Sequence, residues 1–115
     1  MVFERKDMPV KVIEKLRGGT GSIELLQIVP PDALPSKSRL FSIATLQPGC
    51  SIGIHEHTKE TEIYFVIEGE GTIHDNGHDL PFKKGDCNVC GDGSTHGITN
   101  TGDKPLVFLA AIILE

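Results

Sequence analysis

Two histidines separated by one residue, His55 and His57, are the first side chains whose type and spacing suggest chemistry. Residues two apart on a strand point to the same face, so both imidazoles can reach one ion. Glu62 follows, and the polar segment 58–61 is predicted to be a turn that lets Glu62 open the next strand and point back at the histidines. His96 comes after a glycine-rich turn that can deliver it to the same interior.

Three neutral imidazoles and one carboxylate suit Mn, Fe(II), Co, Ni, Cu or Zn. On an ion that prefers six ligands, these four groups leave about two positions for water or a small molecule. A His-x-His pair alone is weak evidence, since an isolated histidine is more often a surface or hydrogen-bonded residue. The spacing of the wider set favours a site for one divalent transition metal.

Other polar residues near this set have weaker claims. Tyr64 has the same strand parity as Glu62, so it is a possible catalytic hydrogen-bond donor in the cavity, with a packed core tyrosine as the alternative. Glu56 is expected to face away from His55. Among the three arginines, only Arg39 lies near a predicted strand of the core, which is weak support for a carboxylate-binding clamp.

No catalytic or metal-binding role is assigned to any of the three cysteines. Cys87 and Cys90 fit a C-x-x-C pattern, but residues three apart on a strand point to opposite faces and cannot readily share a disulfide or an ion. Cys50 lies at an odd spacing from His55 and is expected to point away from the metal. Free thiols are the default for an odd count in a cytoplasmic protein.

Thirteen glycines and seven prolines divide the chain into short segments, few of which have helical spacing of apolar residues. Asn76-Gly77 is typical of a two-residue hairpin turn, which would place Asp75 opposite His78 and His74 opposite Asp79. Many short strands with regular turns favour an antiparallel sandwich or barrel. The predicted strands are 40–46, 51–57, 62–67, 72–74, 79–82, 87–90, 97–100 and 106–114.

The first 38 residues have a less regular pattern. Segment 10–16 fits either a strand or one to two helical turns, 18–21 is a predicted loop, and 23–29 is a predicted strand. No repeat or linker marks a boundary, so 1–115 is predicted to be a single domain.

The charge of the chain excludes several classes of partner. Eleven basic and sixteen acidic residues give a net charge of −5, and the basic residues are scattered, which disfavours nucleic acid and anionic membranes. The longest apolar segment, 106–114, is far shorter than the ~20 residues of a membrane-spanning helix. The charged N-terminal segment does not resemble a signal peptide, so a cytoplasmic location is expected.

The motif spacing resembles that of the cupins. Their first motif is Gly, five residues, His-x-His, three or four residues, Glu, six residues, Gly, and here Gly49, His55, His57, Glu62 and Gly69 match every position. Their second motif is similar to the segment in which Gly85, Gly93, His96 and Asn100 match, while Gly91 stands where the family has proline.

This resemblance implies an all-β antiparallel jelly-roll β-barrel with a core at about 39–114, and the N-terminal extension 1–38 is expected to add strands to a sheet. It also implies a metal bound inside one mouth by His55, His57, Glu62 and His96. Two functions remain open: a metal-dependent oxygenase, decarboxylase or isomerase acting on a small oxygen-donor metabolite, and a non-catalytic small-molecule binding or sensing domain.

Two further expectations concern packing. Ile63, Phe65 and Ile67 have the opposite parity to Glu62, so they predict an outer apolar stripe covered by the N-terminal segment or by a second copy in a homodimer. Alternating apolar residues should supply a core that stays folded without the ion. The residues assigned to that core are Ile43, Leu46, Val66, Leu106 and Phe108.

Overall fold

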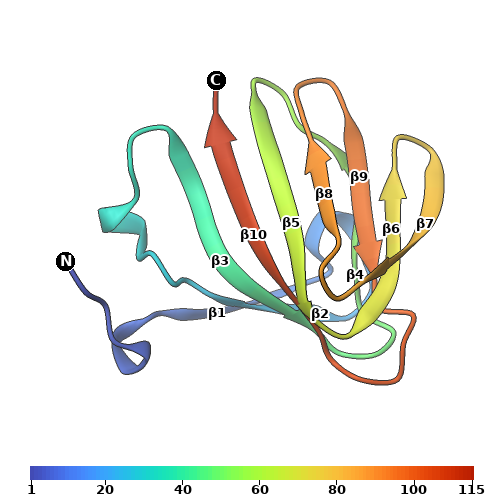
Figure 1. Ribbon diagram of the computed structural model, residues 1–115, viewed down its shortest axis with the longest axis horizontal. Helices are drawn as coiled ribbons and strands as arrows, with labels where there is room; N and C mark the ends of the chain where they lie inside the picture. The colour runs from blue at the N-terminus through green and yellow to red at the C-terminus, as the bar shows by residue number, and fades with distance from the viewer.

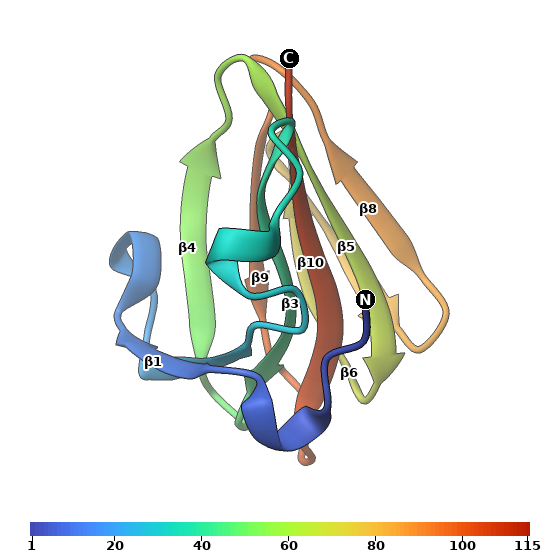
Figure 2. The same cartoon turned by 90° about the vertical axis from the view of Figure 1, so that its left-hand side faces the viewer.

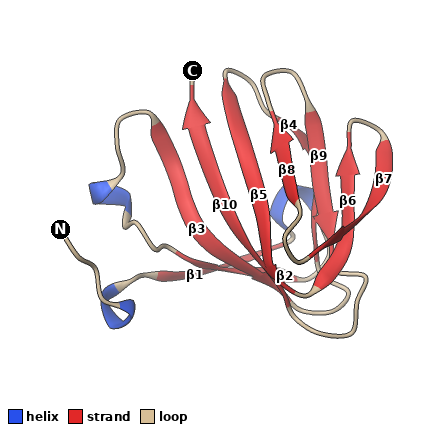
Figure 3. Cartoon of the chain, viewed as in Figure 1, coloured by secondary structure: helices blue, strands red, loops and turns tan.

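Ten strands in two antiparallel sheets form nearly all the regular structure of the computed structural model, which describes residues 1–115 (Figures 1 and 3). In chain order the strands are β1 (Val10–Glu14), β2 (Ser22–Leu26), β3 (Ser38–Leu46), β4 (Ser51–Glu56), β5 (Glu60–Glu68), β6 (Glu70–Asp75), β7 (His78–Lys83), β8 (Cys87–Cys90), β9 (Thr95–Thr99) and β10 (Leu106–Leu114). The rest of the regular structure consists of three single-turn 3₁₀ helices: η1 (Arg5–Asp7), η2 (Leu16–Gly18) and η3 (Pro31–Ala33). The predicted all-β antiparallel class is confirmed.

The two sheets face each other across the core (Figure 2). One has the strand order β1-β2-β3-β10-β5-β8 and the other β4-β9-β6-β7. Strands β1 and β8, and β4 and β7, are therefore sheet edges, and no hydrogen-bonded pair of strands joins the sheets. The jelly-roll fold is thus an open pair of sheets rather than a closed barrel. The N-terminal strands β1 and β2 extend the larger sheet, as expected.

The hairpin between β6 and β7 follows from its turn residues. Asn76 and Gly77 have φ angles of 47° and 84°, the left-handed conformation that a two-residue hairpin turn requires. The register is the predicted one, with Asp75 opposite His78 and His74 opposite Asp79.

The core lies between the two sheets, and its residues alternate along the strands that contribute them. Four of the predicted core residues, Leu46, Val66, Leu106 and Phe108, are fully buried. The fifth prediction, Ile43, was wrong: its odd offset from Leu46 places it on the outer face of β3, where it is only partly buried. No helix in the structure is long and apolar enough to cross a membrane.

The outer face of β5 is apolar and partly exposed. Phe65 and Ile67 are 42% and 39% exposed, and Ile63 is partly buried. Of the two predicted covers, the N-terminal segment is excluded for this stripe, because β1 and β2 pair beyond β3 at the far side of the sheet from β5.

Candidate metal centre

Four side-chain donor atoms meet between the sheets. The Nε2 atom of His57 lies 3.1 Å from the Nε2 atoms of His55 and His96 and 3.0 Å from Oε1 of Glu62. One donor atom from each of these residues lies within 4.8 Å of the others. His57, His96 and Glu62 are at most 5% exposed. The structure therefore brings together the four residues that the sequence predicted, in an arrangement that can hold one ion.

An irregularity in β4 turns His55 into this cluster. The pairing of β4 with β9 shifts between Ile52 and His55, and both side chains face the interior although they are three residues apart. Ile54, between them, is 64% exposed. Cys50 precedes β4, is partly buried and packs against the core, and it is not among the residues of the cluster or of the cavity wall.

Backbone hydrogen bonds join the two motif loops. Gly93 N donates to the His57 carbonyl over 2.8 Å, and His57 N donates to the Ser94 carbonyl over 3.2 Å. These bonds fix the loop that precedes His96, although Gly91 replaces the family's proline there. On β9, His96 then pairs directly with His55 of β4.

The second nitrogen of each imidazole faces an oxygen acceptor. His55 Nδ1 donates to the Gly53 carbonyl over 2.7 Å, and His96 Nδ1 donates to Oδ1 of Asn88 over 2.8 Å. The Nδ1 atom of His57 lies 2.5 Å from a Glu60 carboxylate oxygen. When an ion binds, a proton on Nδ1 leaves the lone pair of each Nε2 to that ion, which is how metal-binding histidines are normally oriented. The donor set therefore fits a divalent transition metal.

Glu60 is a site residue that sequence reasoning missed. Arg39 Nε and Nη2 donate to its two carboxylate oxygens over 2.8 and 2.7 Å. Hydrogen bonding from Arg39 lowers the pKa of Glu60 to about 2, so this carboxylate stays ionised beside His57. The segment 58–61 was expected to be a turn, but β5 begins at Glu60, which shares a face with Glu62 two residues later.

We expect Glu60→Gln to weaken metal binding by ~10–100-fold, because loss of a carboxylate that orients a metal-binding histidine typically has this effect. Glu56→Gln is the matched control, since Glu56 is exposed and its carboxylate accepts a hydrogen bond from Thr58 rather than from a residue of the cluster. Competition with a metallochromic chelator measures both affinities. Equal affinities for the two variants would contradict a role of Glu60 at the site.

The local charges keep Glu62 anionic. Burial raises the pKa of Glu62, but hydrogen bonds from His55, His57 and His96 outweigh burial and hold its pKa far below the usual range. The hydrogen bond with Glu62 raises the pKa of His57, while burial lowers the pKa of His96. Glu62 thus supplies the cluster with a negative charge that favours a cation.

Tyr64 is both a core residue and part of the site wall. It is 1% exposed, and its ring stacks on His96 with centroids 4.5 Å apart and an interplanar angle of 10°. Burial and the charge of Glu62 raise the pKa of the Tyr64 phenol, while the positive charge of Arg17 acts in the opposite direction. The phenol is therefore neutral and fixes the plane of the His96 ring.

A cavity of about 260 Å³ opens from the cluster. Its walls include His55, His57, Glu62 and Tyr64 together with apolar side chains of both sheets. The segment 10–27 forms one wall, where it contributes Lys11, Ile13, Leu16, Arg17, Ile23, Leu25 and Gln27. Sequence analysis treated this segment only as an extension of the sheet and missed its place at the site.

The remaining candidates lie elsewhere. Cys87 is exposed and Cys90 buried, on opposite faces as predicted, and Glu56 faces solvent. His74 is partly buried, and its Nδ1 atom lies at hydrogen-bond distance, 2.6 Å, from Oδ1 of Asp79.

Asn100 of the second motif is structural. Its Nδ2 donates to the carbonyls of Leu46 and Lys104, each over 2.8 Å, and its Oδ1 accepts from Gly102 N.

Comparison with known proteins identifies the family. The family model for the cupin domain matches residues 42–112. A Thermotoga maritima protein named oxalate-binding protein is 43% identical over 99% of this chain and 94% of its own length. The crystal structure of a predicted oxalate decarboxylase from the same organism is also 43% identical, covers both chains fully and superposes with a TM-score of 0.93.

A polyketide cyclase from Streptomyces resistomycificus shares the fold alone, with 16% identity and a TM-score of 0.80 over 100% of this chain and 80% of the cyclase. The matched motifs, the two facing sheets and the histidine–glutamate cluster agree with these comparisons: this chain belongs to the cupin family.

Proposed function

We propose that this protein binds one divalent transition metal through His55, His57, Glu62 and His96 and holds a small carboxylate ligand on it, with oxalate as the first candidate. The observation that carries the proposal is the cluster of four donor atoms within 4.8 Å of one another at the wall of the cavity. The metal is one of Mn, Fe, Co, Ni, Cu or Zn.

The cavity supports a small anionic ligand. Its volume of about 260 Å³ is just below the ~300–1,000 Å³ typical of small-molecule sites, which suits a ligand of few atoms. Lys11, Arg17 and Arg39 line it, whereas Glu62 is the only acidic residue in its wall. Carboxylate oxygens are good ligands for divalent transition metals, and one relative is named for oxalate binding.

Binding is the activity that the site supports best. The only carboxyl group in the wall, Glu62, contacts all three histidines, so no second carboxyl is free to act as a general acid or base. A second candidate is a metal-dependent reaction of the ligand, such as decarboxylation, in which a bound ion would polarise a carboxylate. Its support is the neutral Tyr64 phenol in the wall and the structural relative described as a predicted oxalate decarboxylase.

Titration calorimetry tests the binding function. We expect oxalate to bind the Mn²⁺-loaded protein with a stoichiometry of about one and not to bind the chelator-treated protein, because the ion supplies the principal contact. Oxalate that binds equally well to both forms would contradict a metal-dependent site. Incubation of the loaded protein with oxalate, followed by assays for formate and carbon dioxide, separates binding from decarboxylation.

Removal of the ion should leave a folded protein. The core contains thirteen buried residues, from Ile23 to Ala110, which supply stability without the metal. We therefore expect the chelator-treated protein to keep its circular dichroism spectrum and its cooperative thermal transition, at a lower midpoint. Loss of the transition at room temperature would indicate that the ion is mainly structural.

The outer apolar stripe on β5 supports a homodimer. Phe65 and Ile67 are large, apolar and partly exposed, and two-fold pairing through such a face is the commonest way to bury it. Light scattering at micromolar concentration should give about twice the 12.5 kDa chain mass. The Phe65→Lys variant should have a particle mass closer to that of the monomer. A particle mass of 12.5 kDa for the parent protein would contradict the dimer.

A further inference from the structure

The connection between β1 and β2 is a strained turn that lies beside the metal-binding strand. Lys15, Arg17 and Gly18 have φ angles of 50°, 56° and 79°. Residues other than glycine rarely adopt this left-handed backbone conformation. The turn contains η2 and packs against β4 (Figure 2). Such strain persists only where the surrounding structure holds it, and it is often found at functional sites.

Two glycines allow the backbones of the turn and β4 to touch. A Cβ atom on Gly53 would lie 2.0 Å from the Arg17 carbonyl oxygen, and one on Gly19 would lie 2.2 Å from the Ser51 carbonyl oxygen. Gly53 also accepts the hydrogen bond that orients His55. The backbone of Arg17 is thus held directly against the strand that carries a metal-binding histidine.

Arg17 carries an unpaired positive charge in the cavity wall. The basic side chains that form ion pairs with carboxylates are Lys6, Arg39, Lys83 and Lys84. Arg39 lines the same cavity, but its guanidinium already donates hydrogen bonds to both carboxylate oxygens of Glu60. Lys11 is the other unpaired cation of the wall. Arg17 differs from Lys11 in having a planar guanidinium that can bind a carboxylate through two parallel hydrogen bonds.

We propose that Arg17 is the anion-recognition residue of this cavity and pairs with a carboxylate of the ligand that the metal cluster holds. The turn places Arg17 among the residues that line the same cavity as His55 and His57. This assignment rests on the proposed function, because it takes binding of a carboxylate at the metal as its starting point.

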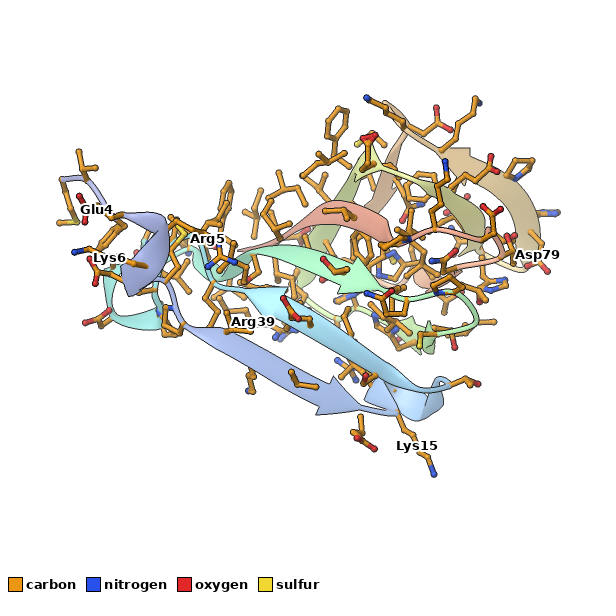
Figure 4. All side chains as sticks on the ribbon, turned by 90° about the horizontal axis from the view of Figure 1, so that it is seen from below. Glu4, Arg5, Lys6, Lys15, Arg39 and Asp79 are labelled. Atoms are coloured by element: carbon orange, nitrogen blue, oxygen red, sulfur yellow. The ribbon has the colours of Figure 1, made fainter.

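The test is titration of oxalate into the Mn²⁺-loaded forms of the parent and three variants. Arg17→Gln removes the charge, and Arg17→Lys keeps the charge but removes the planar fork. Lys15→Gln is the matched control: it removes one positive charge from the same turn, but its side chain extends away from both sheets (Figure 4) and does not line the cavity. Manganese content is measured for each protein before titration.

We expect Arg17→Gln to raise the Kd for oxalate by ~10–100-fold, the usual effect of losing a hydrogen-bonded charge partner, with unchanged manganese content. Arg17→Lys should have a smaller effect, and Lys15→Gln should change the Kd by less than about twofold. Equal Kd values for the parent and Arg17→Gln, or equal losses in Arg17→Gln and Lys15→Gln, would overturn the assignment and leave the proposed function intact. A manganese-loaded parent that does not bind oxalate would overturn both.

Discussion

His57→Ala and Glu62→Ala should each lower metal affinity by more than ~100-fold, because each removes one of the four proposed ligands, and even the loss of an orienting neighbour typically costs ~10–100-fold. His57 is central to the cluster, since its Nε2 atom lies within 3.1 Å of donor atoms from His55, His96 and Glu62. Glu62 contributes the only carboxylate of the set. Elemental analysis after purification without added metal, followed by equilibrium dialysis, measures the change.

The control for this experiment is His74→Ala. His74 is partly buried and, like His57, has a carboxylate partner, here Asp79, but it belongs to the β6–β7 hairpin and not to the cluster. Its removal should leave metal stoichiometry at the parent value. Parent stoichiometry in both His57→Ala and Glu62→Ala would refute the site, whatever the result for the control.

Gly53→Ala should lower the free energy of unfolding by about 2–3 kcal/mol, the upper part of the usual range for overpacking. The added Cβ atom would lie 2.0 Å from the Arg17 carbonyl oxygen and 2.8 Å from its carbon, so either the η2 turn or β4 must move. Because the Gly53 carbonyl orients His55, displacement of β4 should also weaken metal binding. Urea unfolding and metal titration measure the two effects.

The matched control is Gly91→Ala, in the loop before His96. A Cβ atom there meets only the Thr61 hydroxyl oxygen at 3.8 Å, which is an ordinary contact. This substitution should be neutral or stabilise the protein by up to about 1 kcal/mol, through the reduced freedom of the unfolded chain. If Gly53→Ala and Gly91→Ala have the same stability, the close contact between the turn and β4 does not constrain the fold.

The sequence was sufficient to predict the position of a residue where side-chain chemistry or turn geometry determines that position. The spacing of His55, His57 and Glu62 predicted residues that the structure brings together, and Asn76-Gly77 predicted its hairpin register. Strand parity failed where the alternation was interrupted. The shift in β4 places Ile52 and His55 on the same face although they are three residues apart.

Residues that depend on tertiary packing were harder to predict. Glu60 was missed because β5 begins earlier than expected, and a charged residue beside a turn gives no signal that it will face a histidine. Arg17 was missed because its place in the cavity depends on contact between two backbones distant in sequence, which Gly19 and Gly53 permit. Neither glycine has a spacing that predicts such a contact. The open edges of the two sheets likewise depend on strand pairing that motif spacing does not specify.

The most direct test of the account is the visible absorption spectrum of the Co²⁺-loaded protein before and after addition of oxalate. The proposed four-ligand set leaves about two positions on a six-coordinate ion, so oxalate should enter the coordination sphere and change the d–d bands with saturation at about one equivalent. The His57→Ala variant should not give the spectrum of the loaded parent. A Co²⁺ spectrum that is unchanged by saturating oxalate, in protein with one bound Co²⁺ per chain, would contradict an open metal site for a carboxylate ligand.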